Sequence, residues 1–553
     1  MTVVIINDMN KIVKEVKKYK WIYTALVGVV ILSAFLRLWG LGNTPFVADE
    51  FLDVNATYGY HETGKWQAWD FNHGEVSVRD NDASDERAWL YRWQVAQVLD
   101  KFEPTEFTFR LMSALWGVLT TIILYFVTFS FTKNRWIALI TAFLWAVSVP
   151  AIEINRKVRM YSMFAPMFLI FSWSLFQFID SMGRCACTGG TCPGKMIWKG
   201  ILRLRWIYLI PVVILGVISY HLHQLTGNIV LILFVYFVTM FVIKRKELVA
   251  RRYGAYVLSM FIGTLVIKFF VPSVWEQFTS SLVFFDNHWS YIGHIMRNYW
   301  HPILGGLFML AGAWYLVVKQ EDERPGVWIL STFFTTLLGA IFLWDRNVGP
   351  QYIFFVQTFG FMFVASGIYF VAKFLQDHLL CHSCEGRNLT GKIRQFTGKN
   401  RIFVSIVILS LILLPFYGYF ALENNTYHIT ASSDSANYRK VFDYVKRNAN
   451  EGDVMITRNF RNYYWSGMDM TVFDFGSERS EEKIKNEGKV KKITLEYVEN
   501  IVAKNPTGWV VFSDNDKDFI TKESRAYYDD NFKKIDDSSL VRGKVNVYYW
   551  SDQ

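Results

Sequence analysis

The sequence predicts an α-helical polytopic membrane protein with a small external α/β domain after its last membrane span. Hydrophobic residues make up 52% of the 553 residues, aromatic residues make up 18%, and the mean hydropathy is +0.18. Soluble proteins of this length seldom combine such values. The apolar residues also gather into runs of the length that a bilayer core requires, about 20 residues per helix.

Short charged stretches separate the charge-poor runs, as they do between transmembrane helices. Eleven such runs occur, so we expect about eleven transmembrane helices. They are residues 21–42, 108–131, 136–152, 160–179, 206–222, 225–243, 253–272, 303–318, 327–344, 351–372 and 402–422.

Basic residues set the predicted orientation. Lysines precede the first run and no small-residue cleavage site follows it, so we expect a retained anchor and a cytoplasmic N-terminus. Alternation then places the basic loops on the inner side, as the positive-inside rule requires. These loops are residues 133–135, 184–205, 244–252 and 373–401. An odd number of spans leaves the C-terminus outside, and we expect a multi-pass protein of the plasma membrane.

Net charge and cysteines exclude two other classes. The formal net charge of +10 is explained by the inner loops, so no nucleic-acid partner is expected. All five cysteines fall in loops assigned to the reducing side, which argues against a disulfide framework. They are Cys185, Cys187, Cys192, Cys381 and Cys384.

Two predicted external segments are too long to be simple connections, and long loops often carry function. The first, residues 43–107, is expected to contribute to a site, with an amphipathic helix over residues 87–99. The second, residues 423–553, predicts a helix over 435–449 and strands at 454–457, 509–512 and 545–550. The predicted domains are therefore residues 1–422, including the first loop, and residues 423–553.

Two charged clusters are candidates for chemistry. Asp49 and Glu50 are adjacent carboxylates just beyond the outer end of the first span. An acidic helix N-terminus is the alternative reading of this pair. Arg156, Lys157 and Arg159 lie on a predicted outer loop, where few bases are expected, so an anionic ligand such as a lipid phosphate would explain them. Lipid headgroup contact or an ion pair with Glu153 are the alternatives.

Several motifs occur in the order found in one family. They are Phe35-Leu-Arg37-Leu-Trp-Gly-Leu-Gly42, Pro45-Phe-Val-Ala-Asp49-Glu50, Glu106-Phe-Thr-Phe-Arg110-Leu-Met-Ser-Ala-Leu-Trp-Gly117, Asn155-Arg156-Lys157-Val-Arg159-Met-Tyr161-Ser162, Tyr220-His-Leu-His223 and Arg346-Asn-Val-Gly-Pro-Gln351-Tyr352. This arrangement resembles the GT-C class of membrane glycosyltransferases, in particular the protein O-mannosyltransferase and lipid A aminoarabinose-transferase relatives. Gln351 stands where that family usually has Arg.

The resemblance implies a hexosyl- or mannosyltransferase-like enzyme that uses a polyprenyl-phosphate-linked sugar as donor at the outer face. Its partners would be membrane lipids, the lipid-linked sugar, and a glycan, lipid or protein acceptor. Asp49 would be the general base, and Glu50 would orient it or ligate a divalent metal with an external histidine. The substrate-binding residues would be Arg156, Arg159, Tyr161, His223, Arg346 and Tyr352.

A transporter or flippase of lipid-linked substrates is the alternative function. Many spans with the intramembrane charges Arg37 and Lys268 would suit one. Transporters usually show repeated halves with interrupted helices, and the sequence has no such internal symmetry. The glycosyltransferase reading is therefore preferred.

Overall fold

The structure is a computed structural model. It describes residues 18–47, 49–71, 74–76, 88–180, 205–247, 249–280, 288–299, 301–343, 349–376, 405–410, 438–457, 465, 467–468, 470–474, 493–513, 520–536 and 545–551. The chain divides into two compact units. The first comprises Met1–Trp39, Arg87–Tyr91 and Ser113–Gly418, and the second comprises Gly40–Glu86, Arg92–Met112 and Tyr419–Gln553.

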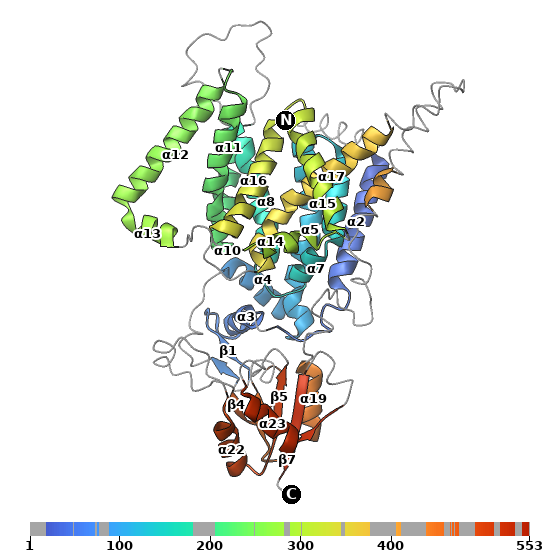
Figure 1. The fold of residues 1–553 in the computed structure, drawn as a ribbon, viewed down its shortest axis with the longest axis vertical. Coiled ribbons are helices and arrows are strands. Elements are labelled where there is room, and N and C mark those ends of the chain that lie inside the picture. Colours follow the sequence, from blue (N-terminus) through green and yellow to red (C-terminus); the bar gives the residue numbers. More distant parts are fainter. Residues whose placement is uncertain are drawn as a thin grey trace, which may run out of the picture. The chain divides into compact units, whose positions relative to one another are not determined.

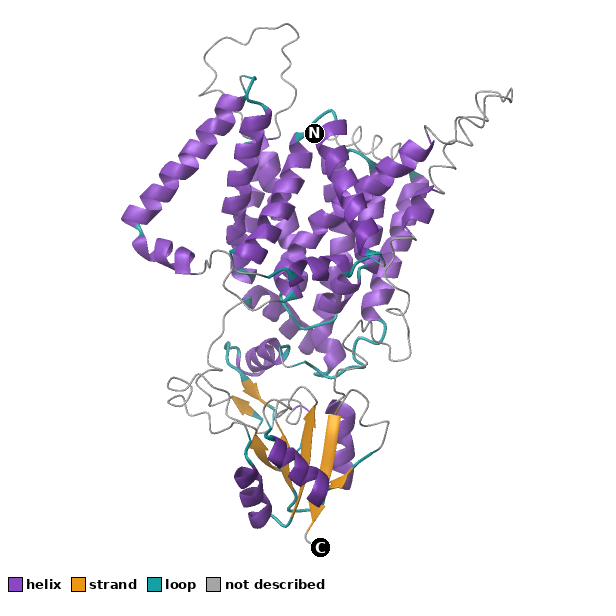
Figure 2. Ribbon diagram, viewed as in Figure 1, coloured by secondary structure: helices purple, strands orange, loops and turns teal. Residues whose placement is uncertain are grey.

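The first unit is built from helices (Figure 1; Figure 2). Its long helices are α2 (Lys20–Leu38), most of α5 (Glu106–Thr132), α6 (Arg135–Val147), α8 (Tyr161–Asp180), α10 (Leu209–Leu222), α11 (Ile229–Ile243), α12 (Ala250–Phe270), α15 (Pro302–Trp314), α16 (Arg324–Phe342) and α17 (Phe354–Phe374). Shorter pieces connect them: α7 (Val149–Asn155), η2 (Trp206–Tyr208), η3 (Gln224–Asn228), α13 (Pro272–Ser280), α14 (Ser290–Met296), η4 (Tyr315–Lys319) and η5 (Pro350–Ile353).

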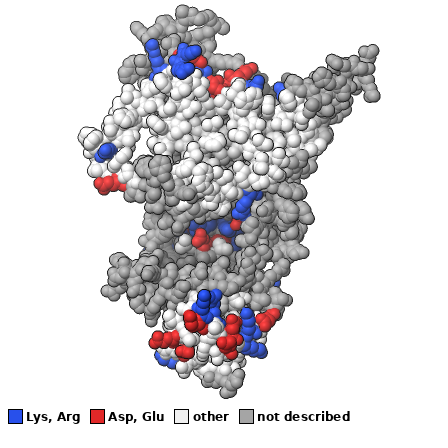
Figure 3. Space-filling model, in the orientation of Figure 1, with Lys and Arg blue, Asp and Glu red and all other residues white. Residues whose placement is uncertain are grey.

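The helices confirm a polytopic membrane protein. Eight helices in the described parts are long and apolar enough to cross a bilayer, and the pair α6 and α7 forms a ninth candidate that is bent by 60°. A shorter apolar helix covers Trp206–Leu222. These elements match ten of the predicted runs, and residues 402–422 lie mostly outside the described residues, so the count of eleven stays a prediction. Figure 3 shows a largely uncharged band over these helices, with charged side chains near its edges.

Helix α17 forms the centre of the first unit, and it packs against α6, α8, α15 and α16. Every residue from Phe354 to Ile368 is buried. Two glycines bring α15 and α17 together, because a Cβ at Gly312 would lie 1.7 Å from the carbonyl oxygen of Phe363, and one at Gly367 would lie 2.0 Å from that of Phe308. Close backbone approach at small residues is a common way for membrane helices to associate.

A buried arginine stabilises the break between α6 and α7. Pro150 has no N–H to donate to the carbonyl of Ala146, which a continuous helix would require. Arg37 on α2 donates instead, from Nη1 to Ala146 O at 3.0 Å and from Nη2 to Trp145 O at 3.2 Å. Its Nε also donates to Asn155 Oδ1 at 3.0 Å, and the side chain is fully buried. Arg37 therefore holds α2, α6 and α7 together.

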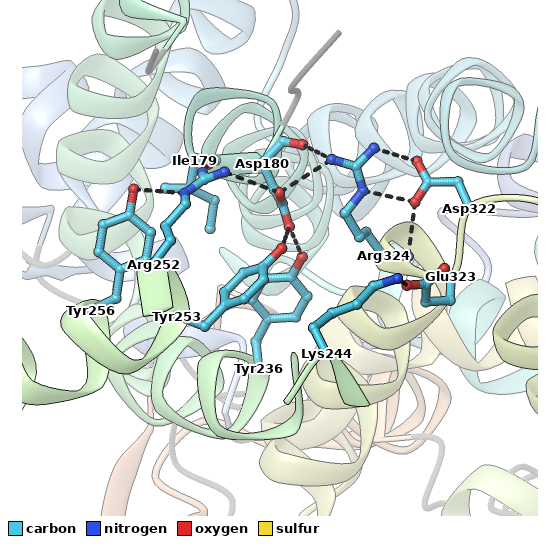
Figure 4. Close-up of polar contacts among 10 residues, drawn as sticks. All are labelled: Ile179, Asp180, Tyr236, Lys244, Arg252, Tyr253, Tyr256, Asp322, Glu323 and Arg324. Carbon is cyan, nitrogen blue, oxygen red and sulfur yellow. Dashed lines mark hydrogen bonds and ion pairs between the residues drawn. The ribbon is translucent and has the colours of Figure 1, made fainter. Parts of the chain in front are cut away.

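A polar cluster joins the ends of α8, α11, α12 and α16 (Figure 4). Asp180 Oδ2 accepts hydrogen bonds from the hydroxyls of Tyr236 and Tyr253, the second at 2.8 Å. Its Oδ1 lies 3.4 Å from Arg324 Nη1 and 3.7 Å from Arg252 Nη1. Asp180 is 2% exposed, so one buried carboxylate links four helices.

The rim of this cluster is more exposed. Arg324 also pairs with Asp322, with Nε 2.8 Å from Oδ1 and Nη2 2.8 Å from Oδ2. Burial raises the pKa of Asp322, but the hydrogen bonds from Arg324 outweigh it and the net shift is downward. Glu323 pairs with Lys244 at 2.6 Å, and this hydrogen bond raises the pKa of Lys244.

The second unit contains the first long loop and the C-terminal residues. The loop supplies α3 (Phe51–Thr63), the strands β1 (Trp69–Asp70) and β2 (Glu75–Val76), and most of α4 (Trp89–Leu99). The C-terminal part supplies α19 (Tyr438–Asn448), β3 (Val454–Thr457), β4 (Thr471–Asp474), α22 (Leu495–Lys504), β5 (Thr507–Ser513), α23 (Lys522–Asn531), β6 (Lys533–Lys534) and β7 (Val545–Ser551).

The C-terminal sheet has the strand order β4-β3-β5-β7-β6, with β3 parallel to β4 and β5, and β7 antiparallel to β5 and β6. Alternate residues face opposite cores, as the period of a strand requires. Val510 and Phe512 pack with residues of α22 and α23, whereas Trp509 and Val511 pack with residues of α19. The helix and strands predicted for the C-terminal residues are confirmed.

Candidate active site

The loop before α3 is fixed by one arginine on the first turns of α5. Arg110 Nε lies 2.9 Å from Glu50 Oε1, and its Nη2 lies 2.8 Å from Glu50 Oε2. The guanidinium also donates to the carbonyl oxygens of Leu41, Thr44 and Pro45 at 2.8 to 3.1 Å. Both charged side chains are at most 3% exposed. Arg110 therefore sets the backbone of this loop as well as pairing with Glu50.

The Glu50 side chain is bound within this loop, whereas the Asp49 side chain is exposed. Glu50 Oε2 also accepts a hydrogen bond from the backbone N–H of Val47 at 2.9 Å. Glu50 also occupies the N-cap position of α3, directly before its first residue. Asp49 is the preceding residue, and its side chain is exposed. Of the two predicted catalytic carboxylates, only Asp49 is accessible to an acceptor from solvent.

A second buried ion pair follows in the same unit. Arg92 on α4 donates from Nε to Asp53 Oδ1 at 2.8 Å, and Asp53 is fully buried. Since Asp53 lies on the first turn of α3, this pair attaches α3 to α4. The predicted helix over residues 87–99 is thus confirmed as α4. Asp53, the partner of Arg92, is unsuited to act as a base, because it is buried and paired.

Arg156 lies at the C-terminal end of α7 and faces the end of α2. Its Nη1 donates to the carbonyl oxygens of Leu36, Arg37 and Trp39, at 3.4, 3.3 and 2.6 Å. The last carbonyls of a helix lack intrahelical partners and carry partial negative charge, so a guanidinium there is stabilising. Arg156, which the sequence predicts to bind substrate, therefore contacts the end of α2.

Four of the predicted substrate-binding residues converge in the first unit. Tyr161 begins α8, His223 follows α10, and Tyr352 lies in η5. The ring centroids of Tyr161 and His223 are 5.3 Å apart, and each lies 6.3 Å from that of Tyr352. The guanidinium of Arg159 lies 5.6 Å from the ring of Tyr161. Residues far apart in sequence thus form one aromatic and basic group.

His223 has a defined hydrogen bond in this group. Its Nδ1 accepts from the backbone N–H of Leu225 at 3.1 Å. A neutral imidazole that accepts at Nδ1 carries its proton at Nε2. His223 therefore offers an N–H donor next to the hydroxyl-bearing rings of Tyr161 and Tyr352.

One carboxylate balances two bases near this group. Glu153 lies 3.4 Å from Lys157 Nζ and 3.3 Å from Arg297 Nη2. The ion pair with Lys157 is one of the alternatives raised by the sequence. Arg297 directly follows α14, and His294 lies within that helix. Burial and the neighbouring Arg297 lower the pKa of His294.

Arg346 lies outside the described residues, so its predicted role stays a prediction. Across the described ranges, no group of three or more His, Cys, Asp or Glu side chains is placed to hold a metal. Sequence reasoning did not assign roles to Arg92, Arg110 or Arg297. Arg110 had a signal, because it stands in the motif that opens α5.

Comparisons with known proteins show the fold. No protein-family model and no curated protein sequence matches the chain. Among solved structures, ArnT from Cupriavidus metallidurans bound to undecaprenyl phosphate gives a TM-score of 0.54 at 11% identity, covering 96% of this chain and 98% of that chain. The oligosaccharyltransferase of Archaeoglobus fulgidus tethered with an acceptor peptide gives 0.53 at 12% identity, covering 91% and 70%.

A second structure of the archaeal oligosaccharyltransferase AglB from Archaeoglobus fulgidus, in complex with an inhibitory peptide and a dolichol-phosphate, gives a TM-score of 0.53 at 11% identity, with the same coverage. Sequence identity this low leaves the fold as the shared property. The order of the sequence motifs and the helical architecture agree with this shared fold. The chain therefore has the fold of the GT-C membrane glycosyltransferases.

Proposed function

We propose that this protein transfers a sugar from a polyprenyl-phosphate donor to an acceptor at the outer face of the membrane. The observation that carries the proposal is the division between Asp49 and Glu50. Glu50 is buried and bound to Arg110, whereas Asp49 is exposed on the loop that this ion pair fixes. An exposed carboxylate on a fixed backbone is suited to general base catalysis.

In the proposed reaction, an oxygen of the acceptor forms a bond to the anomeric carbon of the sugar. The bond between that carbon and the phosphate oxygen breaks, and its electron pair stays on the lipid phosphate. The acceptor proton passes to Asp49. The supporting likeness is to solved structures that contain dolichol-phosphate or undecaprenyl phosphate.

Arg156 and Arg159 are proposed to bind the donor phosphate, because a guanidinium stabilises the charge that develops as the phosphate departs. Tyr161, His223 and Tyr352 would hold the sugar-phosphate through their hydroxyl and imidazole groups, with Arg346 adding charge. Arg159 is the better supported of the two arginines, since it lies at the group formed by these rings.

The test is to incubate the purified protein in lipid bilayers with a panel of radiolabelled polyprenyl-phosphate sugars and candidate acceptors. We expect one label to leave the lipid and enter an acceptor, and the Asp49→Asn variant to leave it on the lipid. A label that crosses the bilayer while it remains on the lipid would instead establish the flippase alternative.

A further inference from the structure

A tryptophan from the C-terminal part of the chain packs onto the loop that carries Asp49. The ring centroid of Trp465 lies 5.0 Å from that of Phe46, 5.0 Å from that of Phe71 and 5.8 Å from that of Phe109. The interplanar angles of 64°, 89° and 77° are edge-to-face arrangements, which aromatic pairs prefer. All four rings belong to the second unit.

Phe46 connects this aromatic group to the candidate base. It lies three residues before Asp49, and it is 2% exposed. The guanidinium of Arg110 lies 5.1 Å from its ring, while the same group fixes the neighbouring carbonyl of Pro45 at 3.0 Å. Phe46 is thus held by Arg110 from α5 and by Trp465 from the C-terminal part.

A second contact from the C-terminal part reaches the start of the same loop. Arg439, in the first turn of α19, donates from Nη1 to the carbonyl oxygen of Gly42 at 3.1 Å. It also forms an ion pair with Glu106 at the start of α5. The C-terminal part therefore contacts the loop at Gly42 and at Phe46, and the Thr44 and Pro45 carbonyls that Arg110 binds lie between these two contacts.

We propose that Trp465 is a positioning residue for Asp49, so that the C-terminal part of the chain completes the loop carrying the base. The expected effect on catalysis rests on the proposed function. The expected effect on the position of the loop is independent of it. Without the Trp465 ring, Phe46 keeps its contacts with Arg110 and Phe51 but loses the edge-to-face contact with the indole. We expect Phe46, and with it the loop that carries Asp49, to be less restricted.

The first experiment measures the loop without any assay of activity. In the full-length protein with its five cysteines replaced by serine, Asp49→Cys is combined with Trp465→Ala, Trp465→Phe or Trp66→Ala. The rate of modification by a water-soluble maleimide is then followed. Trp66 is the matched control, since it is a tryptophan of the same unit whose ring packs elsewhere, stacked on Tyr60 at 4.1 Å.

We expect Trp465→Ala to change the modification rate several-fold relative to the Asp49→Cys parent. Trp465→Phe should give a rate close to that of the parent, and Trp66→Ala should leave the rate unchanged. Equal rates in Trp465→Ala and its parent, with the thermal unfolding of both proteins unchanged, would overturn the proposal. Should Trp465→Ala fail to fold, Trp465→Leu and Arg439→Gln supply the same comparison with smaller losses of packing.

The second experiment measures turnover in proteins that retain Asp49. A displaced base lowers the rate of the chemical step, and a shift near 1 Å can cost about a hundredfold. We expect Trp465→Ala to lower kcat about tenfold or more with the KM for the lipid donor unchanged. A wild-type protein without transfer activity would reject the proposed function, while the modification rates would still decide the position of the loop.

Discussion

Arg110 and Glu50 form a two-point ion pair, with 2.9 Å between Nε and Oε1 and 2.8 Å between Nη2 and Oε2. Such a fork geometry restricts orientation as well as distance. The same guanidinium also binds three backbone carbonyls, so the pair holds the loop on which Asp49, the residue before Glu50, lies. Two adjacent carboxylates thereby acquire different roles.

Asp49→Asn should keep the shape of this loop and remove the base. We expect turnover to fall by a factor on the order of a hundred or more, with little change in thermal stability. Transfer from the lipid donor by the folded variant is the measurement. Activity equal to that of wild type would exclude Asp49 as the base.

Glu50→Gln should act mainly on folding. The substitution leaves the Arg110 guanidinium buried without its counter-charge, and breaking a buried pair costs about 3–5 kcal/mol. Thermal unfolding in detergent should therefore shift to a clearly lower temperature than for Asp49→Asn. If Glu50→Gln is as stable as wild type but inactive, Glu50 takes part in the chemistry directly.

Arg156→Lys and Arg159→Lys should separate a structural contact from a binding contact. A lysine at 156 loses the geometry that reaches three carbonyls at the end of α2, so stability should fall. A lysine at 159 should leave stability unchanged and raise the KM for the lipid donor, since it loses two-point binding of phosphate. Unchanged KM values for both would favour contact with lipid headgroups.

Asp180→Asn should destabilise the helical unit. It removes the negative charge between Arg252 and Arg324, and we expect a loss of about 3–5 kcal/mol. The matched control is Asp322→Asn, whose side chain is 47% exposed and whose ion pair should contribute at most about 1 kcal/mol. Unfolding curves of the two variants decide whether the buried carboxylate dominates the cluster.

His294 should make the protein less stable as the pH falls. Its pKa in the folded state lies below the ordinary value of 6.5, so the unfolded state binds more protons at a pH below that value. Stability is then lost on acidification through 6.5 and below. His294→Gln should reduce this slope, which a series of unfolding curves between neutral and mildly acidic pH would measure.

The sequence predicted most helices because hydrophobic length is a local property. It also predicted the helix and strands of the C-terminal sheet from their periods of 3.6 and 2. The bend of 60° between α6 and α7 was harder to predict, since the run of residues 136–152 contains no charged residue and resembles one continuous span. Pro150 and Ser148, the N-cap of α7, carried the local signal of a break.

The candidate site was predictable in its residue types but not in its pairings. Asp49 and Glu50 are equivalent in sequence, and only the contact with Arg110, 60 residues later, distinguishes them. The grouping of Tyr161, His223 and Tyr352 likewise depends on how α8, α10 and η5 pack. Trp465 had no periodic pattern to mark it, because its contacts are with residues more than 350 positions earlier.

Because of the break at Pro150, a substitution at this position also affects Arg37. The Ala146 carbonyl takes its donor from Arg37, 109 residues earlier in the chain. Replacing Pro150 by alanine would restore a backbone N–H and let α6 continue, which would displace the buried Arg37 guanidinium from the Ala146 carbonyl. Attempts to stabilise this protein by straightening the helix must therefore also replace Arg37 with a neutral side chain of similar volume, such as methionine.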